Sequence, residues 1–265
     1  MPVIDRPGAR VAYTVSGSGP PLILGHSLFC TRAMWDGVLE RLEGYTVINV
    51  ELRGHGESTA TAPFDLWDLV DDWTAILDAE GHNVAVCGGL STGGFTGMRM
   101  ALKFPQRVRG LVLFDTASEG EPRMQQFQYG FLGWLYQTTG VLPVKKLAKS
   151  MFGSYTRQHV PQRVSELITE VRQFDRRQLG HAMSAVFGRQ SVDLSQIRLP
   201  TLIAVGEEDQ ATPPHQGRQM AGQIAGSELH LIPKAGHLSA VEQPNTVAQL
   251  MIDFLPKCWS DAKPA

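Results

Sequence analysis

Residues 84–94, Val-Ala-Val-Cys-Gly-Gly-Leu-Ser-Thr-Gly-Gly, decide the fold of this 265-residue chain. The apolar run before the glycines predicts a strand at residues 83–87, and residues 93–104 have the apolar spacing of a helix. Gly-x-Ser-x-Gly between a strand and a helix is the pattern of a nucleophile elbow, a sharp turn that exposes a serine hydroxyl. Gly89 and Gly93 are expected to be glycine because such a turn brings neighbouring backbone too close for a Cβ atom.

We therefore predict that Ser91 is a catalytic nucleophile. The alternative is a glycine-rich turn with a serine that caps the following helix. That alternative explains the glycines but gives no reason for a strand directly before the serine and a helix directly after it. The N-terminus of that helix would also favour a developing negative charge beside Ser91.

Short apolar runs alternate with helical patterns on both sides of this motif. The expected strands are residues 10–16, 22–25, 46–50, 83–87, 110–114, 201–206 and 228–233. The expected helices are residues 33–42, 64–79, 93–104, 215–224 and 241–255. Because the strands are apolar throughout and separated by helices, we predict an α/β fold with a mostly parallel central sheet flanked by helices. On the helix at residues 64–79, four aspartates, Asp65, Asp68, Asp71 and Asp72, are expected to face water.

The alternation stops between residues 119 and 192, which contain no convincing strand and many aromatic side chains. We interpret residues 119–192 as a helical cap inserted into a core made of residues 1–118 and 193–265. Ligands bind at the carboxyl edge of open α/β sheets, so the cap is expected to cover an apolar pocket there. Packing inside the cap is the alternative role for each of its aromatics. The candidate substrate-binding residues are Phe29, Trp134, Phe152, Phe187 and Leu238.

His237 is the candidate base among the chain's eight histidines. It lies in a glycine-containing loop directly after the last expected strand, and the chain order Ser, acid, His suits a serine nucleophile on this kind of sheet. Asp209 follows the strand at residues 201–206, where a carboxylate can orient the imidazole and stabilise the imidazolium that forms. Asp115, after the strand at residues 110–114, is the alternative acid. Glu207 and Glu208 are expected to face solvent.

An oxyanion formed at Ser91 would need two N–H donors. The backbone N–H of Thr92, the residue after the nucleophile, is expected to be one of them. The other should come from the loop that follows residues 22–25, where spacing alone does not separate Ser27, Leu28 and Phe29. His26 is expected to brace this loop.

With these motifs in place, the chain resembles the α/β-hydrolase fold family, in particular cap-bearing serine hydrolases such as carboxylesterases, enol-lactonases and cofactor-free haloperoxidases. The motifs that carry the resemblance are Gly25-His26-Ser27-Leu28, Arg53-Gly54-His55-Gly56-Glu57-Ser58, Gly89-Leu90-Ser91-Thr92-Gly93-Gly94, Gly206-Glu207-Glu208-Asp209 and Gly236-His237. The resemblance implies that the N–H of Leu28 is the second oxyanion donor. It also implies that Arg53 and His55 brace a turn.

Two positions depart from the pattern of the family. Ser27 stands where the family usually has glycine, and a serine followed by leucine is similar to the loop of enol-lactonases. Glu51 stands where the family commonly has aspartate, in a segment whose role is expected to be structural. The motifs are specific for the fold and the triad and say little about the substrate.

Composition excludes several other functions. Hydrophobic residues make up 43% of the chain, charged residues 19%, and the net charge is −2, with no basic patch of the kind that binds nucleic acid. The N-terminal segment has no apolar run, and the longest apolar stretches are strand-sized, so neither a secretory signal nor a membrane partner is expected. Cys30, Cys87 and Cys258 lie far apart, which favours reduced thiols in a cytoplasmic protein. No metal or other cofactor is expected.

The leading hypothesis is hydrolysis of a small-molecule carboxylic ester or lactone through an acyl-enzyme, by a monomer or homodimer. One alternative is a carbon–carbon bond hydrolase of ring-cleavage diketones, which would need a cationic anchor for a substrate carboxylate. The candidate anchors are Arg157, Arg172, Arg176, Arg177 and Arg189, each of which is more simply a solvated helix charge. Another alternative is a non-catalytic, receptor-like homologue that binds a ligand. A haloalkane dehalogenase is disfavoured, because it would need aspartate at position 91.

Overall fold

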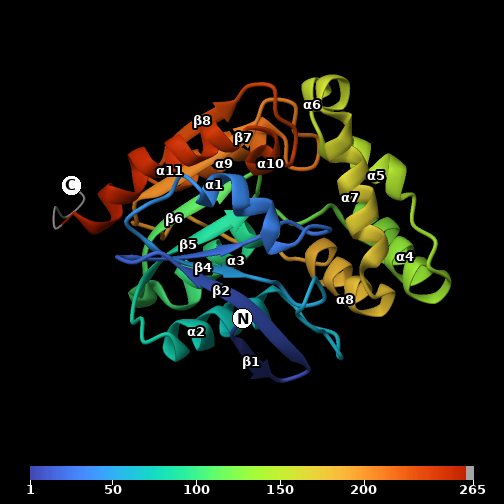
Figure 1. Cartoon of the computed structure of the whole chain (residues 1–265), viewed down its shortest axis with the longest axis horizontal. Helices are drawn as coiled ribbons and strands as arrows, with labels where there is room; N and C mark the ends of the chain where they lie inside the picture. The colour runs from blue at the N-terminus through green and yellow to red at the C-terminus, as the bar shows by residue number, and fades with distance from the viewer. Residues whose placement is uncertain (261–265) are drawn as a thin grey trace.

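The computed structural model describes residues 1–260 and shows a central sheet with helices on both faces and a separate group of helices at one end (Figure 1). The strands are β1 (Val3–Arg6), β2 (Ala9–Ser16), β3 (Pro21–Gly25), β4 (Thr46–Val50), β5 (Ala85–Leu90), β6 (Val108–Phe114), β7 (Thr201–Gly206) and β8 (Glu228–Ile232). The helices of the core are η1 (Arg32–Trp35), α1 (Asp36–Leu39), α2 (Leu66–Ala79), α3 (Thr92–Lys103), η2 (Pro105–Arg107), α9 (Pro214–Gln223), α10 (Ser239–Glu242) and α11 (Pro244–Trp259). The helices between β6 and β7 are α4 (Arg123–Thr139), α5 (Val144–Met151), α6 (Ser154–His159), α7 (Pro161–Gln173) and α8 (Arg176–Phe187).

The sheet has the order β1-β2-β4-β3-β5-β6-β7-β8. Pairs β1–β2 and β2–β4 are antiparallel and all other pairs are parallel, which confirms the predicted fold class. Strand β1 was not predicted, because it is a short edge strand with half-exposed residues and no apolar run. The chain passes from β3 to β4 on one side and returns to β5 on the other, so β3 and β5 enclose a topological switch point. In open α/β sheets such a point is where ligands bind.

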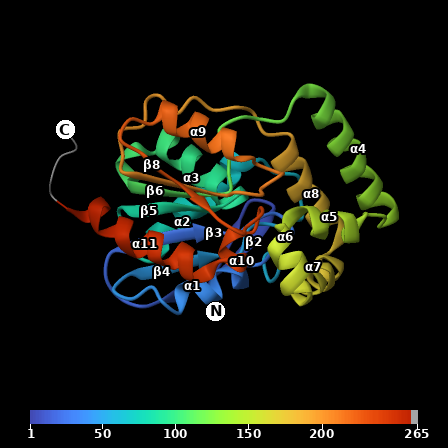
Figure 2. The same cartoon turned by 90° about the horizontal axis from the view of Figure 1, so that it is seen from above.

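Helices cover both faces of the sheet. Helices α1 and α11 lie against one face, and α3 and α9 lie against the other (Figure 2). This double cover explains why every residue of β5 and β7 is buried and why those strands are apolar throughout.

Asp72 on α2 is buried, so the prediction that it faces water is wrong. Its carboxylate accepts two hydrogen bonds of 2.7 Å from the Nε and Nη2 of Arg53, and a third of 3.1 Å from Arg6. Position 72 lies three residues after Leu69 and four before Ile76, so it shares their buried face of the helix. The pair fixes α2 to the turn after β4, the bracing role expected for Arg53.

The helices between β6 and β7 form a compact group at the carboxyl end of the parallel strands, at the right of Figure 1. Helix α4 packs on α8, and α5 and α6 pack on α7. The turn between α5 and α6 contacts the core directly, since Met151 accepts a 2.8 Å hydrogen bond from the N–H of His237. The Ser154 N–H and hydroxyl both donate to Glu208, which is half-buried, whereas Glu207 is exposed as expected.

We predict that Asp72→Ala lowers the free energy of unfolding by about 3–5 kcal/mol, because it leaves the buried Arg53 guanidinium without its carboxylate partner. Urea denaturation followed by circular dichroism measures the loss. Asp71→Ala is the matched control on the same helix, because Asp71 pairs with Lys103 at the surface and should contribute less than about 1 kcal/mol. Equal losses in the two variants would contradict the structural role of the Arg53–Asp72 pair.

Candidate active site

Ser91 occupies a strained turn between β5 and α3. Its backbone has φ 52° and ψ −103°, outside the regions that a non-glycine residue normally adopts. The turn is held by a 2.9 Å hydrogen bond from the Ser91 N–H to the Phe114 carbonyl and by a 3.0 Å bond from the Thr116 hydroxyl to the Ser91 carbonyl. Backbone strain of this kind persists where the surroundings enforce it, and it is common at functional sites.

The glycines of the elbow allow β3 and β5 to meet. A Cβ atom on Gly89 or on Gly93 would lie 2.1 Å from the carbonyl oxygen of Gly25, which agrees with the predicted crowding. The Gly93 N–H also donates to the His26 carbonyl at 3.2 Å. The loop that follows β3 is therefore held beside Ser91.

Of the three N–H groups considered as the second oxyanion donor, those of Ser27, Leu28 and Phe29, one has no acceptor in the part of the chain that the structure describes. The N–H groups of Ser27, Phe29 and Cys30 each donate within the chain, whereas that of Leu28 has no acceptor among residues 1–260. The Thr92 N–H lies at the first position of α3, where N–H groups lack partners within the helix. Leu28 and Thr92 are therefore the pair of donors that the geometry supports for an oxyanion.

His26 braces this loop through both ring nitrogens. Its Nδ1 lies 2.8 Å from the Ser27 carbonyl, and its Nε2 lies 2.9 Å from the N–H of Leu52. The same Nε2 lies 3.2 Å from Oε1 of the buried Glu51, so both ring nitrogens contact groups within the chain. His26 is therefore a structural residue, as expected.

His237 and Asp209 form a buried pair at the ends of β8 and β7. The Nδ1 of His237 lies 2.9 Å from Oδ2 of Asp209 and 3.1 Å from Oδ1. The hydroxyl of Thr212 donates to Oδ2 at 2.8 Å, and the N–H groups of Ala211 and Thr212 donate to Oδ1. Burial alone would raise the pKa of Asp209, but His237 and these donors hold that pKa below its ordinary value.

Asp115, the alternative acid, has a different environment. It is fully buried, and its carboxyl oxygens accept hydrogen bonds from the N–H groups of Gly206 at 2.8 Å and Ser239 at 3.1 Å. Burial and the neighbouring Asp209 raise the pKa of Asp115 well above its ordinary range. Among residues 1–260, His237 has a carboxylate hydrogen bond to Asp209 and none to Asp115, so the geometry supports Asp209 as the acid and Asp115 as a brace between two loops.

A cavity of about 280 Å³ opens over the elbow. Of the predicted site residues, it is lined by Ser91, His237, Leu28, Phe29 and Phe187. The other residues that line it are Ser27, Phe95, Glu121, Tyr129, Leu147, Ser150, Met151, Val186, Arg189, Gln210, Ala211 and Thr212. The cavity is small and mostly apolar, with a few polar groups, which is the usual character of a small-molecule site.

Three predicted substrate contacts lie elsewhere. Trp134 is 57% exposed, because α4 turns Gly133 and Tyr136 inward. The apolar residues of α4 form only a weak pattern, so the sequence did not reveal which face of the helix is buried. Phe152 and Leu238 are buried and line a separate cavity of about 210 Å³. Phe152 directly follows Met151, whose carbonyl accepts a hydrogen bond from the His237 N–H and holds the α5–α6 turn against the core.

Several lining residues were not predicted. Tyr129 stacks on Phe187 with ring centroids 4.5 Å apart, and Thr212 positions Asp209. The spacing Asp209-x-x-Thr212 could have indicated this second contact, since a hydroxyl three residues after a loop carboxylate often bonds to it. Arg189 was considered only as one of five cap arginines, and its burial could not be read from the sequence.

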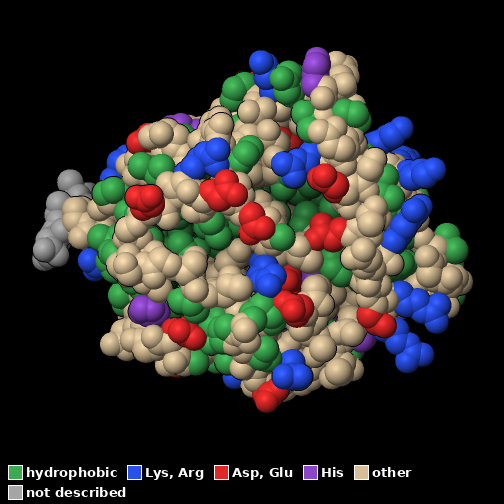
Figure 3. Space-filling model, in the orientation of Figure 1, with side chains coloured by type: hydrophobic (Ala, Val, Ile, Leu, Met, Phe, Trp, Pro, Cys, Tyr) green, Lys and Arg blue, Asp and Glu red, His purple; other side chains and the backbone are tan. Residues whose placement is uncertain are grey.

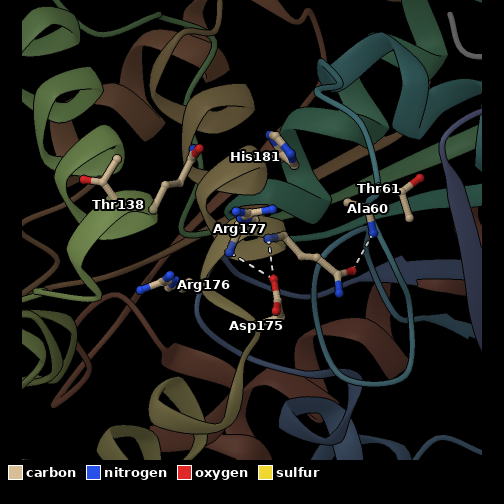
Figure 4. Close-up of a pocket in the computed structure, with 9 residues that line it drawn as sticks. Ala60, Thr61, Thr138, Asp175, Arg176, Arg177 and His181 are labelled. Carbon is tan, nitrogen blue, oxygen red and sulfur yellow. Dashed lines mark hydrogen bonds between the residues drawn. The ribbon is translucent and has the colours of Figure 1, made fainter.

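A larger and more open depression lies between residues 60–61 and helices α4 and α8 (Figure 4). Asp175 caps α8 there by accepting from the N–H groups of Arg177 and Gln178, and the Gln178 side chain accepts from the N–H of Ala60. None of the candidate catalytic residues lines this depression. It is a surface feature of the junction between the cap helices and the core.

The described residues were also compared with the requirements of a metal site, a disulfide and a membrane span. Residues 1–260 contain no group of three or more His, Cys, Asp or Glu side chains arranged to hold a metal ion. Within the same residues, all three cysteines are free and buried. None of the helices described has both the length and the apolar character needed to cross a membrane.

Residues 20–244 match the α/β-hydrolase fold family, and the chain belongs to it. The chain is 29% identical over 230 residues to 3-oxoadipate enol-lactonase 2 of Acinetobacter baylyi, covering 85% of this chain and 84% of that protein. It is 26% identical to a pimeloyl-[acyl-carrier protein] methyl ester esterase of Neisseria meningitidis, over 87% of this chain and 90% of that one. A thermophilic esterase from Thermogutta terrifontis superposes with a TM-score of 0.90 at 27% identity, covering 95% of each chain. The chain is a hydrolase of this fold.

We predict that the imidazole of His237 titrates above its ordinary pKa of 6.5 in the folded protein. Burial opposes the charged form, but the Asp209 carboxylate favours it more strongly and raises the pKa. His237 should therefore be protonated below this raised value and neutral above it. An NMR titration of the histidine ring signals, assigned with His237→Gln, measures the pKa, and Asp209→Asn should lower it. A value at or below 6.5 that does not respond to Asp209→Asn would contradict the pairing.

Proposed function

We propose that this chain hydrolyses small carboxylic esters or lactones through an acyl-enzyme on Ser91. The proposal rests on one observation above all. Ser91 and His237 line the same cavity, and the buried Asp209 has a carboxylate oxygen 2.9 Å from Nδ1 of the imidazole. The names of the enol-lactonase and esterase relatives are consistent with this chemistry.

In the first half of the reaction, Ser91 Oγ attacks the substrate carbonyl carbon while His237 Nε2 removes the hydroxyl proton. The carbonyl oxygen becomes an oxyanion that accepts hydrogen bonds from the N–H groups of Leu28 and Thr92. Asp209 stabilises the imidazolium and keeps it oriented. The tetrahedral intermediate then breaks its bond to the alkoxide, which takes the proton from His237. A lactone would leave that alcohol attached to the acyl group.

In the second half, a water molecule replaces the alcohol. His237 takes a proton from the water as its oxygen attacks the acyl carbon, and the same two N–H groups hold the second oxyanion. Collapse of this intermediate breaks the bond to Ser91 Oγ, which regains the proton from His237. The products are the free acid and the original enzyme, and no cofactor is needed.

The strained backbone at Ser91 supports catalysis over a passive binding role. A receptor that only enclosed a ligand would need neither a positive φ at position 91 nor a charged carboxylate behind a buried histidine. The apolar cavity walls, including Phe29, Tyr129 and Phe187, suit a substrate whose acyl or alkyl part is apolar.

We expect a fluorophosphonate probe to label the protein once, at Ser91, and Ser91→Ala to abolish both the labelling and ester turnover. Intact-mass analysis and peptide mapping locate the adduct, and a panel of short acyl esters and lactones measures turnover. Ser27→Ala is the control, since Ser27 lines the same cavity but has no paired base. An adduct on Ser27, or a wild-type protein that is neither labelled nor active, would overturn the proposal.

We predict that Asp209→Asn lowers turnover by roughly 10,000-fold, the loss measured for the same change in the serine-protease triad. Asp115→Asn should cost much less, because asparagine can still accept from one of its two N–H partners and the acid behind His237 is untouched. Steady-state kinetics on the best ester of the panel compare the two variants. If Asp115→Asn proves the more damaging change, Asp115 is the catalytic acid.

A further inference from the structure

Two arginines are buried beside the catalytic cavity, and the mechanism uses neither. Arg189 lies just after α8, lines the cavity and is 6% exposed, and Arg99 on α3 is 2% exposed. The other candidate anchors differ, because Arg172, Arg176 and Arg177 are exposed and Arg157 is half-buried. Figure 3 shows several Lys and Arg side chains on the surface at the cap end of the molecule. Buried charges are costly unless a partner compensates them, so this pair calls for an explanation.

One nitrogen of the Arg189 guanidinium, Nη1, makes the polar contacts of this side chain. Its Nη1 donates to the Val186 carbonyl at 3.0 Å and lies 3.0 Å from Oε1 of Glu121. The guanidinium stacks 4.2 Å from the ring centre of Phe95. Neither Nε nor Nη2 has an acceptor among the described residues, and Nε is buried.

The two nitrogens without an acceptor, Nε and Nη2, form the edge of a guanidinium that commonly binds carboxylates. Nε and Nη2 point the same way and present two parallel N–H groups, which match the two oxygens of a carboxylate. Arg53 shows this geometry within the same chain, since its Nε and Nη2 each lie 2.7 Å from an oxygen of Asp72. Arg189 offers the same pair of donors beside the catalytic cavity.

Arg99 adds a second positive charge. Its Nη1 and Nη2 donate to the carbonyls of Phe95 and Gln190, and no ion pair is found for it within residues 1–260. Burial, and then the nearby charge of Arg189, lower the pKa of Arg99 to about 10. Within residues 1–260, Glu121 is thus the single carboxylate paired with either of these two buried guanidinium groups, and it pairs with Arg189.

We propose that Arg189, supported by Arg99, binds a carboxylate carried by the substrate, so that the preferred substrates are esters or lactones with a free acid group. This inference rests on the proposed function and deepens it. Phe95 links the two sites, because its N–H bonds to the Ser91 carbonyl at 2.8 Å while its ring faces Arg189. Arg189 therefore packs on the residue that lies one helical turn of α3 after the nucleophile.

Monomethyl glutarate and methyl 5-oxohexanoate test the proposal, because a methyl ketone replaces the carboxylate of the first ester in the second. In the wild type, kcat/KM should be at least about 10-fold higher for monomethyl glutarate. Arg189→Met should lower this ratio by about 10- to 100-fold, the loss expected for a charge-assisted hydrogen bond. Arg189→Lys, which keeps the charge but not the paired donors, should give a smaller loss. Glu121→Gln should raise the ratio by removing the competing carboxylate.

Arg172→Met is the matched control, because Arg172 is an exposed arginine on α7 that does not line the cavity, and it should leave the ratio unchanged. Should Arg189→Met fail to fold, Arg189→Lys decides the question. Isothermal titration of both esters into Ser91→Ala measures their binding without turnover. A preference for binding monomethyl glutarate would support the carboxylate site even if the wild type hydrolysed neither ester, a result that would refute only the proposed function. Equal or weaker binding and turnover of monomethyl glutarate would overturn the carboxylate site.

Discussion

The site depends on the close approach of the elbow glycines to the carbonyl oxygen of Gly25. Because the Cβ positions of Gly89 and Gly93 both fall 2.1 Å from it, the ends of β3 and β5 approach as closely as backbone allows. This approach places the loop of Leu28 beside Ser91 and accounts for the strained backbone of the serine. The oxyanion donors and the nucleophile are consequently fixed by the same packing. Preorganisation of this kind lets dipoles stabilise charge without reorganising during the reaction.

The remaining parts of the site are assembled by hydrogen bonds between loops. Asp115 joins the end of β7 to the loop after His237, and Glu242 accepts from the N–H groups of Gly153 and Gly236. The helices inserted between β6 and β7 are therefore tied by hydrogen bonds at the α5–α6 turn to the loop that carries His237. The inner surface of these helices supplies the apolar cavity wall, and the linker after them supplies Arg189.

The sequence allowed the fold class and seven of the eight strands to be predicted, because the strands are apolar throughout and the elbow motif defines its own context. The positions of Ser91, His237 and Asp209 followed from chain order and from the ends of strands. The side-chain environments did not follow. Asp72 was predicted to face water because its charge was given more weight than its position on the buried face of the helix. Trp134 was predicted to line the pocket because an aromatic side chain does not reveal which face of a weakly amphipathic helix is buried. The burial of Arg189 depends on packing between α3 and the cap linker, which no local pattern encodes.

In the proposed mechanism, Ser91, His237 and the N–H groups of Leu28 and Thr92 act on one carbonyl group. A crystal structure of the protein inactivated by a small alkyl phosphonate tests this directly, since the tetrahedral phosphorus stands in for the acyl carbon at the transition state. We predict a covalent bond from Ser91 Oγ to phosphorus and one phosphonyl oxygen within about 2.7–3.1 Å of both the Leu28 and Thr92 nitrogens. Attachment at another residue, or a phosphonyl oxygen bonded to the N–H of Phe29 in place of Leu28, would contradict this account.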